Sequence, residues 1–520
     1  MNAAQDNRPP REGLRFLARA FGSVLLIALL TAGATATATL LQIKTEIAPP
    51  KDAPPPVPTH EVTEAKPGKP QTIMILGSDR RFADIKKNNP LLKHSNPARS
   101  DTILLVRMDP DQDATAVLSI PRDLKVLIPG YGINKINAAY SLGGADLTAK
   151  TIKSLFGQDF KINHIINVNF GGFREVVDEL GCVYADVDRR YYHSNLGLPV
   201  SAHYAEIDID PGYQQLCGQR ALDYVRFRHA DSDIVRAARQ QDFLRSAKDQ
   251  LNSSSLIDDR SRLIKIMQRS TQTDASLRSV KGVLKLAKLA IFSAGHPVAQ
   301  IKFPPVYSGD AATGEYVEAS ESTLLKLRNE FFHASPHVKK TTSAKKTKKQ
   351  AKADSGNARV AKARLTRATR VGEDLVARTV ASHRLGFRLY FPSRLTPNGR
   401  YASTINDGST TDPTPRVYTI RDRAGHPHKA YRLVVLENIQ EGSYYGVQGT
   451  SWKTPPLLEK PTSTLTVHGR RLALFKSGNR LRYVAWKRKN AVYWVSNSLT
   501  LSLSNAQMLG IAGSLTHLGS

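Results

Sequence analysis

The sequence is poor in the residues that build common catalytic and metal sites. It has no Cys-x-x-Cys pair, no His-x-x-x-His pair within a predicted helix, and no Gly-x-Ser-x-Gly segment. It also has no glycine-rich loop of the nucleotide-binding type, and the pair Gly143-Gly144 alone predicts nothing. These absences set aside the usual zinc, dithiol, serine-hydrolase and nucleotide-loop motifs.

Cysteine is scarce as well, since only Cys182 and Cys217 occur in 520 residues. Both lie in what reads as the first folded region. In an oxidising compartment a disulfide between them would add roughly 3–4 kcal/mol in the chain-entropy model. The alternative is a pair of unpaired buried thiols.

Acidic residues are outnumbered, with 45 Asp and Glu against 74 Lys and Arg, so the net charge is +29. This imbalance predicts anionic partners, which are nucleic acid, anionic lipid or a phosphate-rich polymer. The net charge alone does not indicate which of these three partners the protein binds. The length of 520 residues predicts two or three domains.

The N-terminus narrows the choice of compartment. Residues 1–19 contain four arginines and precede an uncharged run over residues 20–43, which is long enough to span a bilayer. Arginines before such a run favour a cytoplasmic N-terminus and an extracytoplasmic remainder. A cleaved signal peptide is the rival, because Ala34–Ala38 offers small residues to a peptidase. The apolar pair Leu40-Leu41 beyond that site favours a single-pass signal anchor in the cell membrane.

Composition divides the rest of the chain into four parts. Residues 44–70 form a Pro-rich linker, and residues 71–335 have a mixed α/β pattern. Residues 336–382 are a Lys/Arg-rich linker predicted to be disordered, in which 339–370 hold twelve basic residues against one acid. This linker is either a solvated tether or a contact with anionic wall polymer or lipid headgroups. Residues 383–520 form a separate β-rich domain.

Three strands are predicted at the start of the α/β domain, over 72–76, 102–108 and 115–120. If they pair as an antiparallel meander, the end of the first, the start of the second and the end of the third share one sheet edge. That edge would gather a set of charged residues, which are Asp79, Arg99, Asp101, Arg122 and Asp123. Such a cluster at the edge of a buried sheet indicates a site.

Further elements follow from apolar periodicity. Helices are predicted over 145–156, 170–180, 279–292, 322–332 and 504–515. Strands are predicted over 164–168, 183–187, 387–391, 417–420, 431–436, 464–467, 472–475, 481–486 and 491–495. The Tyr and Trp side chains of the β-rich domain could bind sugar, but core packing is the favoured role.

The most basic motif runs from Ala221 to His229. Arg226 and Arg228 alternate with Val225 and Phe227, so an extended backbone would aim both guanidiniums the same way.

A helix is predicted to follow and to end at about Leu251. Arg236 and Gln240 share one face of this helix with apolar residues further along it, so that face is expected to point toward the interior. Buried guanidiniums need anions. Structural salt bridges are the alternative to an anionic ligand.

Aspartates with few competing soft ligands suit Mg²⁺, and arginines bind phosphate oxygens in bidentate fashion. Together these residues predict phosphoryl chemistry. Six segments in this order and approximate spacing resemble the LytR-CpsA-Psr (LCP) family. They are Gly77–Asp79, Arg99–Thr102, Ile120–Asp123, Lys135–Tyr140, Tyr224–His229 and Arg236–Gln241.

The resemblance implies a three-layer α/β/α core with a mixed central sheet over residues 71–335. It implies a membrane-anchored extracytoplasmic phosphotransferase that moves a glycopolymer from a polyprenyl diphosphate carrier onto peptidoglycan by phosphodiester formation, with pyrophosphatase as a side activity. It says nothing about the separate β-rich domain.

Carried over by position, Asp79 and Asp101 would hold Mg²⁺, and Asp101 or a neighbouring carboxylate would act as the base. Five arginines would grip the diphosphate and serve in catalysis; they are Arg99, Arg122, Arg226, Arg228 and Arg236. Gln240 and Lys135 would assist, and the polyprenyl tail would lie between sheet and helices. One departure is Val235, where the family usually has glycine before the arginine.

Two rival functions remain at this point. A membrane-anchored scaffold or regulator could grip anionic wall polymer without chemistry. A nucleic-acid binder ranks third, because the predicted export makes nucleic acid an unsuitable partner and no reader helix is present.

Overall fold

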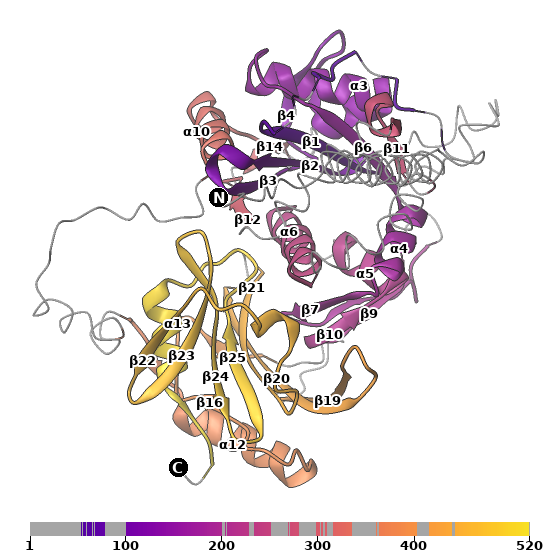
Figure 1. Ribbon diagram of the computed structural model, residues 1–520. Helices are drawn as coiled ribbons and strands as arrows, with labels where there is room; N and C mark the ends of the chain where they lie inside the picture. The colour runs from indigo at the N-terminus through magenta and orange to yellow at the C-terminus, as the bar shows by residue number, and fades with distance from the viewer. Residues whose placement is uncertain are drawn as a thin grey trace, which may run out of the picture.

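The computed structural model describes two folded regions joined by a broad interface (Figure 1). The described residues are 54, 56–58, 60–64, 66, 68–78, 100–199, 203, 205–227, 233–250, 269, 271–279, 298–301, 303, 304, 307, 308, 316–334, 360, 363–402, 415–438 and 442–518. No helix within them is long and apolar enough to span a bilayer. The predicted anchor over 20–43 and nearly all of the predicted helix over 279–292 lie outside them.

The first region is built on a mixed six-stranded sheet in the order β11-β6-β1-β2-β3-β12. β1, β2 and β3 form the predicted antiparallel meander, while β6 runs parallel to β1 and β12 runs parallel to β3. The strands are β1 (Gln71–Ser78), β2 (Ser100–Asp109), β3 (Ala114–Ile120), β6 (His164–Asn169), β11 (Thr271–Thr273) and β12 (Val298–Ile301).

Alternation along these strands separates the two faces of the sheet. Met74 and Leu76 of β1 point into a core beneath α3 (Ile136–Phe156) and α10 (Glu321–Phe332). Their neighbour Ile75 points to the other side, where α4 (Phe170–Glu179), α5 (Gly218–Arg226) and α6 (Asp233–Gln250) lie (Figure 1). The result is the expected three-layer α/β/α core.

Helix α3 begins nine residues earlier than the predicted helix, at Ile136. It contains a kink at Gly143-Gly144, where Gly144 has a φ of 65°. A side chain is strained in that conformation, so glycine permits the helix axis to change direction here. The kink lets Ile136 and Ala139, before it, and Ala149 and Ile152, after it, all pack into the same core.

Two small antiparallel pairs extend this region beyond α5. They are β7 (Val183–Val187) with β10 (Gly212–Leu216), and β8 (Tyr191–His193) with β9 (Ile207–Ile209). Cys182 and Cys217 flank the β7–β10 pair and form a disulfide with a Cα–Cα distance of 4.6 Å. The predicted disulfide is confirmed.

The C-terminal region is an eight-stranded antiparallel sheet, in the order β18-β20-β21-β25-β24-β23-β22, with β19 also paired to β20. Its strands are β18 (Arg400–Tyr401), β19 (Arg416–Arg421), β20 (Pro427–Asn438), β21 (Ser443–Thr450), β22 (Ser463–Val467), β23 (Arg470–Ser477), β24 (Arg480–Arg488) and β25 (Ala491–Ser496). Short pairs join β15 (Thr366–Arg367) to β17 (Arg394–Leu395) and β16 (Phe391–Pro392) to β26 (Leu515–Thr516).

Two predictions for this region need correction, and one strand was not predicted. The strand predicted over 387–391 is formed only at its last residue, Phe391, because the preceding side chains pack as an irregular segment on the sheet. β21 was not predicted, since its small residues interrupt the apolar pattern. Residues 369–382, assigned to a disordered linker, form α12 (Thr369–Ser382), whose Leu375 and Val376 are buried against the sheet.

The two faces of the C-terminal sheet have different partners. One packs against α12 and α13 (Asn505–Gly513), through Met508 and Leu509. The other packs against the β7–β10 pair, where Tyr184 and Tyr213 join Trp452 in one buried aromatic cluster. The aromatic residues of this domain therefore serve packing, both within the domain and between the two regions.

Candidate active site

The ends of β1, β2 and β3 meet at one edge of the sheet, as predicted. Ser78 at the end of β1 pairs with Ser100 at the start of β2, and Ile103 pairs with Ile120 at the end of β3. Asp79, Arg99 and Arg228 lie outside the described residues, and of Asp101 only the backbone, in β2, is described. Arg122 and Asp123 follow directly on β3.

A hydrogen-bonded network fixes the end of β1. Tyr140 donates from its hydroxyl to Ser78 Oγ at 3.3 Å, and Asn167 of β6 donates to Tyr140 Oη at 2.6 Å. All three side chains are buried, so each hydrogen bond replaces one that water would otherwise make. The network places the Lys135–Tyr140 segment beside the end of β1 although Tyr140 is not exposed.

Arg122 and Lys135 are brought together by one carboxylate. Arg122 Nε donates to Asp123 Oδ2 at 3.3 Å, and Lys135 Nζ lies 3.3 Å from Asp123 Oδ1. The hairpin of β4 (Lys125–Ile128) and β5 (Gly132–Lys135) carries Lys135 back to the end of β3. Among the described residues, Asp123 thus holds both cations at the same corner of the sheet.

Residues 221–226 of the motif are helical and not extended. Arg228 and His229 lie outside the described residues, so the common direction expected for Arg226 and Arg228 stays a prediction. Residues 218–226 form α5, in which Gln219 donates to Asp223 Oδ1 at 2.7 Å across one helical turn. The alternation of Arg and apolar residues is too short to override the helical spacing of the buried Ala221, Leu222 and Tyr224. Arg226 is the last residue of α5, and its guanidinium lies 4.5 Å from the centre of the Phe170 ring.

α6 presents the predicted stripe to a cavity. Arg236 and Gln240 line that cavity, followed one turn later by Phe243 and Leu244 and then by Ala247. Gln240 donates from Nε2 to Thr102 Oγ1 at 3.0 Å and to the carbonyl of Val225 at 3.1 Å. Gln240 therefore connects the start of β2 to the end of α5. Arg226, at the end of α5, and Arg236, on α6, both line the cavity beside it.

Arg239 has a structural role. Its side chain is fully buried, donates to the carbonyl of Phe227 at 2.5 Å and lies 4.7 Å from the centre of the Tyr191 ring. The contact fixes the chain just after α5. Arg226 is thereby held at its position by two residues of α6, Arg239 and Gln240.

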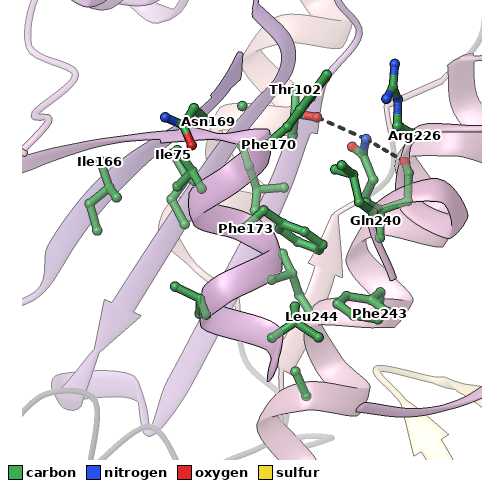
Figure 2. A pocket seen from close by; sticks show the side chains of 18 of the residues that line it. Ile75, Thr102, Ile166, Asn169, Phe170, Phe173, Arg226, Gln240, Phe243 and Leu244 are labelled. Atoms are coloured by element: carbon green, nitrogen blue, oxygen red, sulfur yellow. Dashed lines mark hydrogen bonds between the residues drawn. The ribbon is translucent and has the colours of Figure 1, made fainter. Parts of the chain in front are cut away.

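The cavity between the sheet and helices α4, α5 and α6 has a volume of about 440 Å³ (Figure 2). Arg226, Gln240 and Thr102 lie at one end, and Phe243 and Leu244 lie toward the other. The rest of its wall is mostly apolar and comes from Ile75, Leu104, Ile166, Phe173, Val176, Val177, Leu180, Val183, Leu222 and Ala247. Such a cavity fits a ligand with a long apolar body and one anionic end.

Asp223 lies beneath the basic end of the cavity. It is 7% exposed, and burial raises the pKa of its carboxyl, while the hydrogen bond from Gln219 and the nearby charge of Arg226 act in the opposite direction. Asp223 therefore places one acidic group near the guanidinium of Arg226.

Sequence reasoning missed the residues that shape the apolar wall. Phe173, Val177 and Leu180 recur at helical spacing along α4 and its C-cap, which was an available signal for one face of the wall. Thr102 and Ile75 carried no such signal, because a strand residue can face either a core or a cavity.

Comparison with known proteins agrees with this geometry. The family model described as LytR_cpsA_psr family matches residues 34–332. This chain belongs to the LytR-CpsA-Psr family. The described sheet, helices and cavity thus form the family domain, and the C-terminal sheet lies beyond the matched residues.

Two relatives have names that state an activity. The chain is 32% identical over 223 residues to the polyisoprenyl-teichoic acid–peptidoglycan teichoic acid transferase TagT of Bacillus subtilis, covering 43% of this chain and 66% of that protein. It is 32% identical over 220 residues to TagU of Oceanobacillus iheyensis, which carries the same activity name, covering 41% of this chain and 61% of that protein. The chain thus spans less than two thirds of either relative.

One solved structure is described as the LytR-CPS2A-psr family protein YwtF (TagT) with bound octaprenyl pyrophosphate lipid. It is 25% identical, has a TM-score of 0.38, and covers 53% of this chain and 95% of its own.

Proposed function

We propose that this protein transfers a glycopolymer from a polyprenyl diphosphate carrier to peptidoglycan. One observation carries the proposal: an apolar cavity ends at Arg226 and Arg236. A polyprenyl chain would fill the apolar part, and its diphosphate would lie against the two guanidiniums. The names of the TagT and TagU relatives support the same class of substrate.

The chemistry follows from where the charges lie. A hydroxyl of the acceptor sugar attacks the phosphorus nearer the glycan, a new P–O bond forms, and the P–O bond to the polyprenyl phosphate breaks. Negative charge grows on the leaving oxygen, and Arg226 and Arg236 stabilise it electrostatically. The hydroxyl proton passes to a carboxylate, for which we propose Asp101. With water as the acceptor, the same step would be the pyrophosphatase side reaction.

Arg122 and Lys135 belong to the same proposal, because Asp123 holds both at the sheet edge. Arg99 and Arg228 are proposed to complete the grip on the diphosphate, and Gln240 to orient it. Gln240 already donates to Thr102 and to the backbone of α5, so its amide is fixed before substrate binds.

We further propose that Asp79 and Asp101 hold Mg²⁺. Ser78, which precedes Asp79 in the sequence, pairs with Ser100, which precedes Asp101, and carboxylates are the ligands that Mg²⁺ prefers. The ion would neutralise charge on the diphosphate oxygens. The proposed location is the outer side of the cell membrane, with residues 20–43 as a single-pass anchor and the N-terminus in the cytoplasm.

The test uses the full-length protein, a lipid-diphosphate-linked glycan and peptidoglycan fragments, with and without Mg²⁺. We expect Mg²⁺-dependent release of polyprenyl phosphate together with glycan attached to peptidoglycan. Arg236→Ala should lower the rate by about 10²–10³-fold. Arg220→Ala is the matched control, because Arg220 is an exposed arginine of α5 that does not line the cavity.

Full transfer by a folded Arg236→Ala protein would refute the proposed role of the cavity. Tight binding of the lipid-linked glycan with no release of polyprenyl phosphate would instead establish the scaffold as the function.

A further inference from the structure

A second cavity lies where α6 meets the C-terminal domain. Its volume is about 260 Å³, and its wall comes from α6, β12, β23, β24 and the segment around the 3-10 turn Pro456–Leu458. Figure 1 shows α6 between the sheet of the family domain and the C-terminal sheet. α6 turns Leu244 and Ala247 toward the apolar cavity, and Arg245 and Lys248 toward this second one.

The second cavity is basic. Five cationic side chains line it, Arg245 and Lys248 from α6, and Lys460, Lys476 and Arg482 from the C-terminal domain. Two acidic residues also line it, Asp249 and Glu459, so positive charge is in excess. The cations come from both domains, and the cluster therefore exists only when the domains are docked.

One donor of Arg245 has no acceptor in the part of the chain that the structure describes. Its side chain is 7% exposed, and Nη2 donates to Gln300 Oε1 at 3.1 Å. The other terminal nitrogen, Nη1, is buried and makes no hydrogen bond among the described residues. A buried charged donor left unsatisfied is costly, so this nitrogen is available to an oxyanion that enters the cavity.

Asp242 and Asp249, the two acids that act on Arg245, both pair with Arg482. Asp242 lies 2.8 Å from Arg482 Nη2, which also donates to Ser246 Oγ at 3.2 Å. Burial, followed by the charge of Arg482, lowers the pKa of Arg245 to about 10, although Asp242 and Asp249 act to raise it. Burial also lowers the pKa of Lys248, where Arg245 and Lys460 add to the effect and Asp249 opposes it. Burial is the main cause of both shifts, and the neighbouring cations add to it.

We propose that this cavity binds a phosphate group, which accepts hydrogen bonds from Arg245 and forms ion pairs with Lys248, Lys460 and Lys476. The group would be either free phosphate or one phosphodiester of an anionic wall polymer. Because the site joins α6 to the C-terminal domain, its ligand stabilises the docked arrangement. The proposal does not depend on the transferase activity, since Arg226 and Arg236 are not part of the site.

The two sites are separate but share a helix. Arg236 and Arg245 are nine residues apart, roughly 14 Å along α6 at the usual helical rise. A phosphate at the second cavity would therefore fix the helix that carries Arg236 and Gln240.

The experiment uses the full-length protein with Arg226→Ala and Arg236→Ala, which weakens the first anion site by removing the two arginines that line the apolar cavity. Inorganic phosphate is titrated by calorimetry, and the midpoint of thermal unfolding is recorded in parallel. We expect saturable binding and a midpoint that rises with phosphate concentration. Adding Lys460→Ala and Lys476→Ala should weaken binding at least tenfold, whereas Lys487→Ala, an exposed lysine of β24 that does not line the cavity, should leave it unchanged.

A second arm titrates a glycerol phosphate oligomer. Binding at least tenfold tighter than that of inorganic phosphate identifies a polymer phosphodiester as the ligand, and equal affinity per phosphate identifies free phosphate. Absence of saturable binding by either probe overturns the proposal. So does binding that survives Lys460→Ala and Lys476→Ala in a protein whose unfolding midpoint without phosphate is unchanged.

Discussion

Arg432 and Asp186 form a buried ion pair that connects the two domains. Arg432 Nη1 lies 3.1 Å from Asp186 Oδ1, and the two side chains are 0% and 1% exposed. Trp494 donates to the other carboxylate oxygen at 3.2 Å. Asp186 belongs to β7, whereas Arg432 and Trp494 belong to the C-terminal sheet. A charge pair buried this deeply requires the two surfaces to remain in contact.

Asp186→Ala should lower the free energy of unfolding by about 3–5 kcal/mol, because it leaves Arg432 buried without its carboxylate. Urea unfolding, followed by tryptophan fluorescence, measures the loss. The double variant Asp186→Leu with Arg432→Met removes both charges and should regain most of the lost free energy of unfolding. A loss below about 1 kcal/mol in the single variant would show that water reaches Arg432.

Leu244→Trp should weaken binding of long-chain polyprenyl diphosphates by at least tenfold, because the larger side chain occupies the apolar cavity. A ten-carbon prenyl diphosphate should bind about as well as before, since it needs only the basic end. Titration of the two ligands distinguishes a filled apolar cavity, which affects only the long-chain ligand, from misfolding, which affects both. Leu325→Trp is the control, because Leu325 is 52% exposed on α10 and lies on the opposite side of the sheet. Equal weakening for both ligands would contradict the predicted position of the tail.

Gln240→Glu should reduce affinity for polyprenyl diphosphate by roughly tenfold or more, since it places a carboxylate beside the bound anion at nearly constant volume. The effect should be largest at low salt, where charges are least screened. Gln215→Glu supplies the matched control, as Gln215 is exposed on β10 and does not line the cavity. Unchanged affinity in Gln240→Glu would mean that the diphosphate does not approach α6.

Asp274 should make stability depend on acid pH. Burial raises the pKa of its carboxyl, but hydrogen bonds with His164, Ser276 and the backbone of Ile165 outweigh burial and hold that pKa below 3.8. The folded-state pKa is below the unfolded value, so the stabilisation is present above the unfolded pKa and is lost as pH falls through the folded one.

Asp274→Asn should therefore cost about 1–3 kcal/mol at neutral pH and much less in strong acid. Thermal unfolding of both proteins across the acid range measures the difference. If the loss of stability in Asp274→Asn were the same at every pH, its cause would be the altered hydrogen-bond geometry and not the carboxylate charge.

The disulfide should stabilise the β7–β10 pair. Cys182 and Cys217 are 35 positions apart, and closing a loop of that length is worth about 4 kcal/mol in the chain-entropy model. Cys182→Ser with Cys217→Ser should lose stability of this order in urea. Addition of a reductant should lower the midpoint of the parent protein and leave that of the double variant unchanged. An equal midpoint for the parent and the double variant would contradict this account.

Elements with a clear local period could be predicted from the sequence. The meander of β1–β3, strand β7 and helices α4, α6 and α10 were predicted to within a few residues, because each carries its own apolar pattern and each packs one face. The stripe of Arg236 and Gln240 was also readable, since helical spacing determines which side chains share a face. The motif at 221–229 could not be assigned from its pattern, because four alternating residues fit a strand and a helix about equally well; the structure shows a helix as far as Arg226.

The cavity and the docking of the domains required the tertiary structure. The cavity exists because Ile75, Phe173 and Leu244 come from three elements distant in the chain and do not fill the space between them. Nothing in the local pattern around Asp186 shows that its partner is Arg432, 246 positions away. Residue type and spacing determined which chemistry this chain carries. Only the packing of distant faces decided where its charges meet, because electrostatic and apolar contacts depend on distance in space and not on order in the sequence.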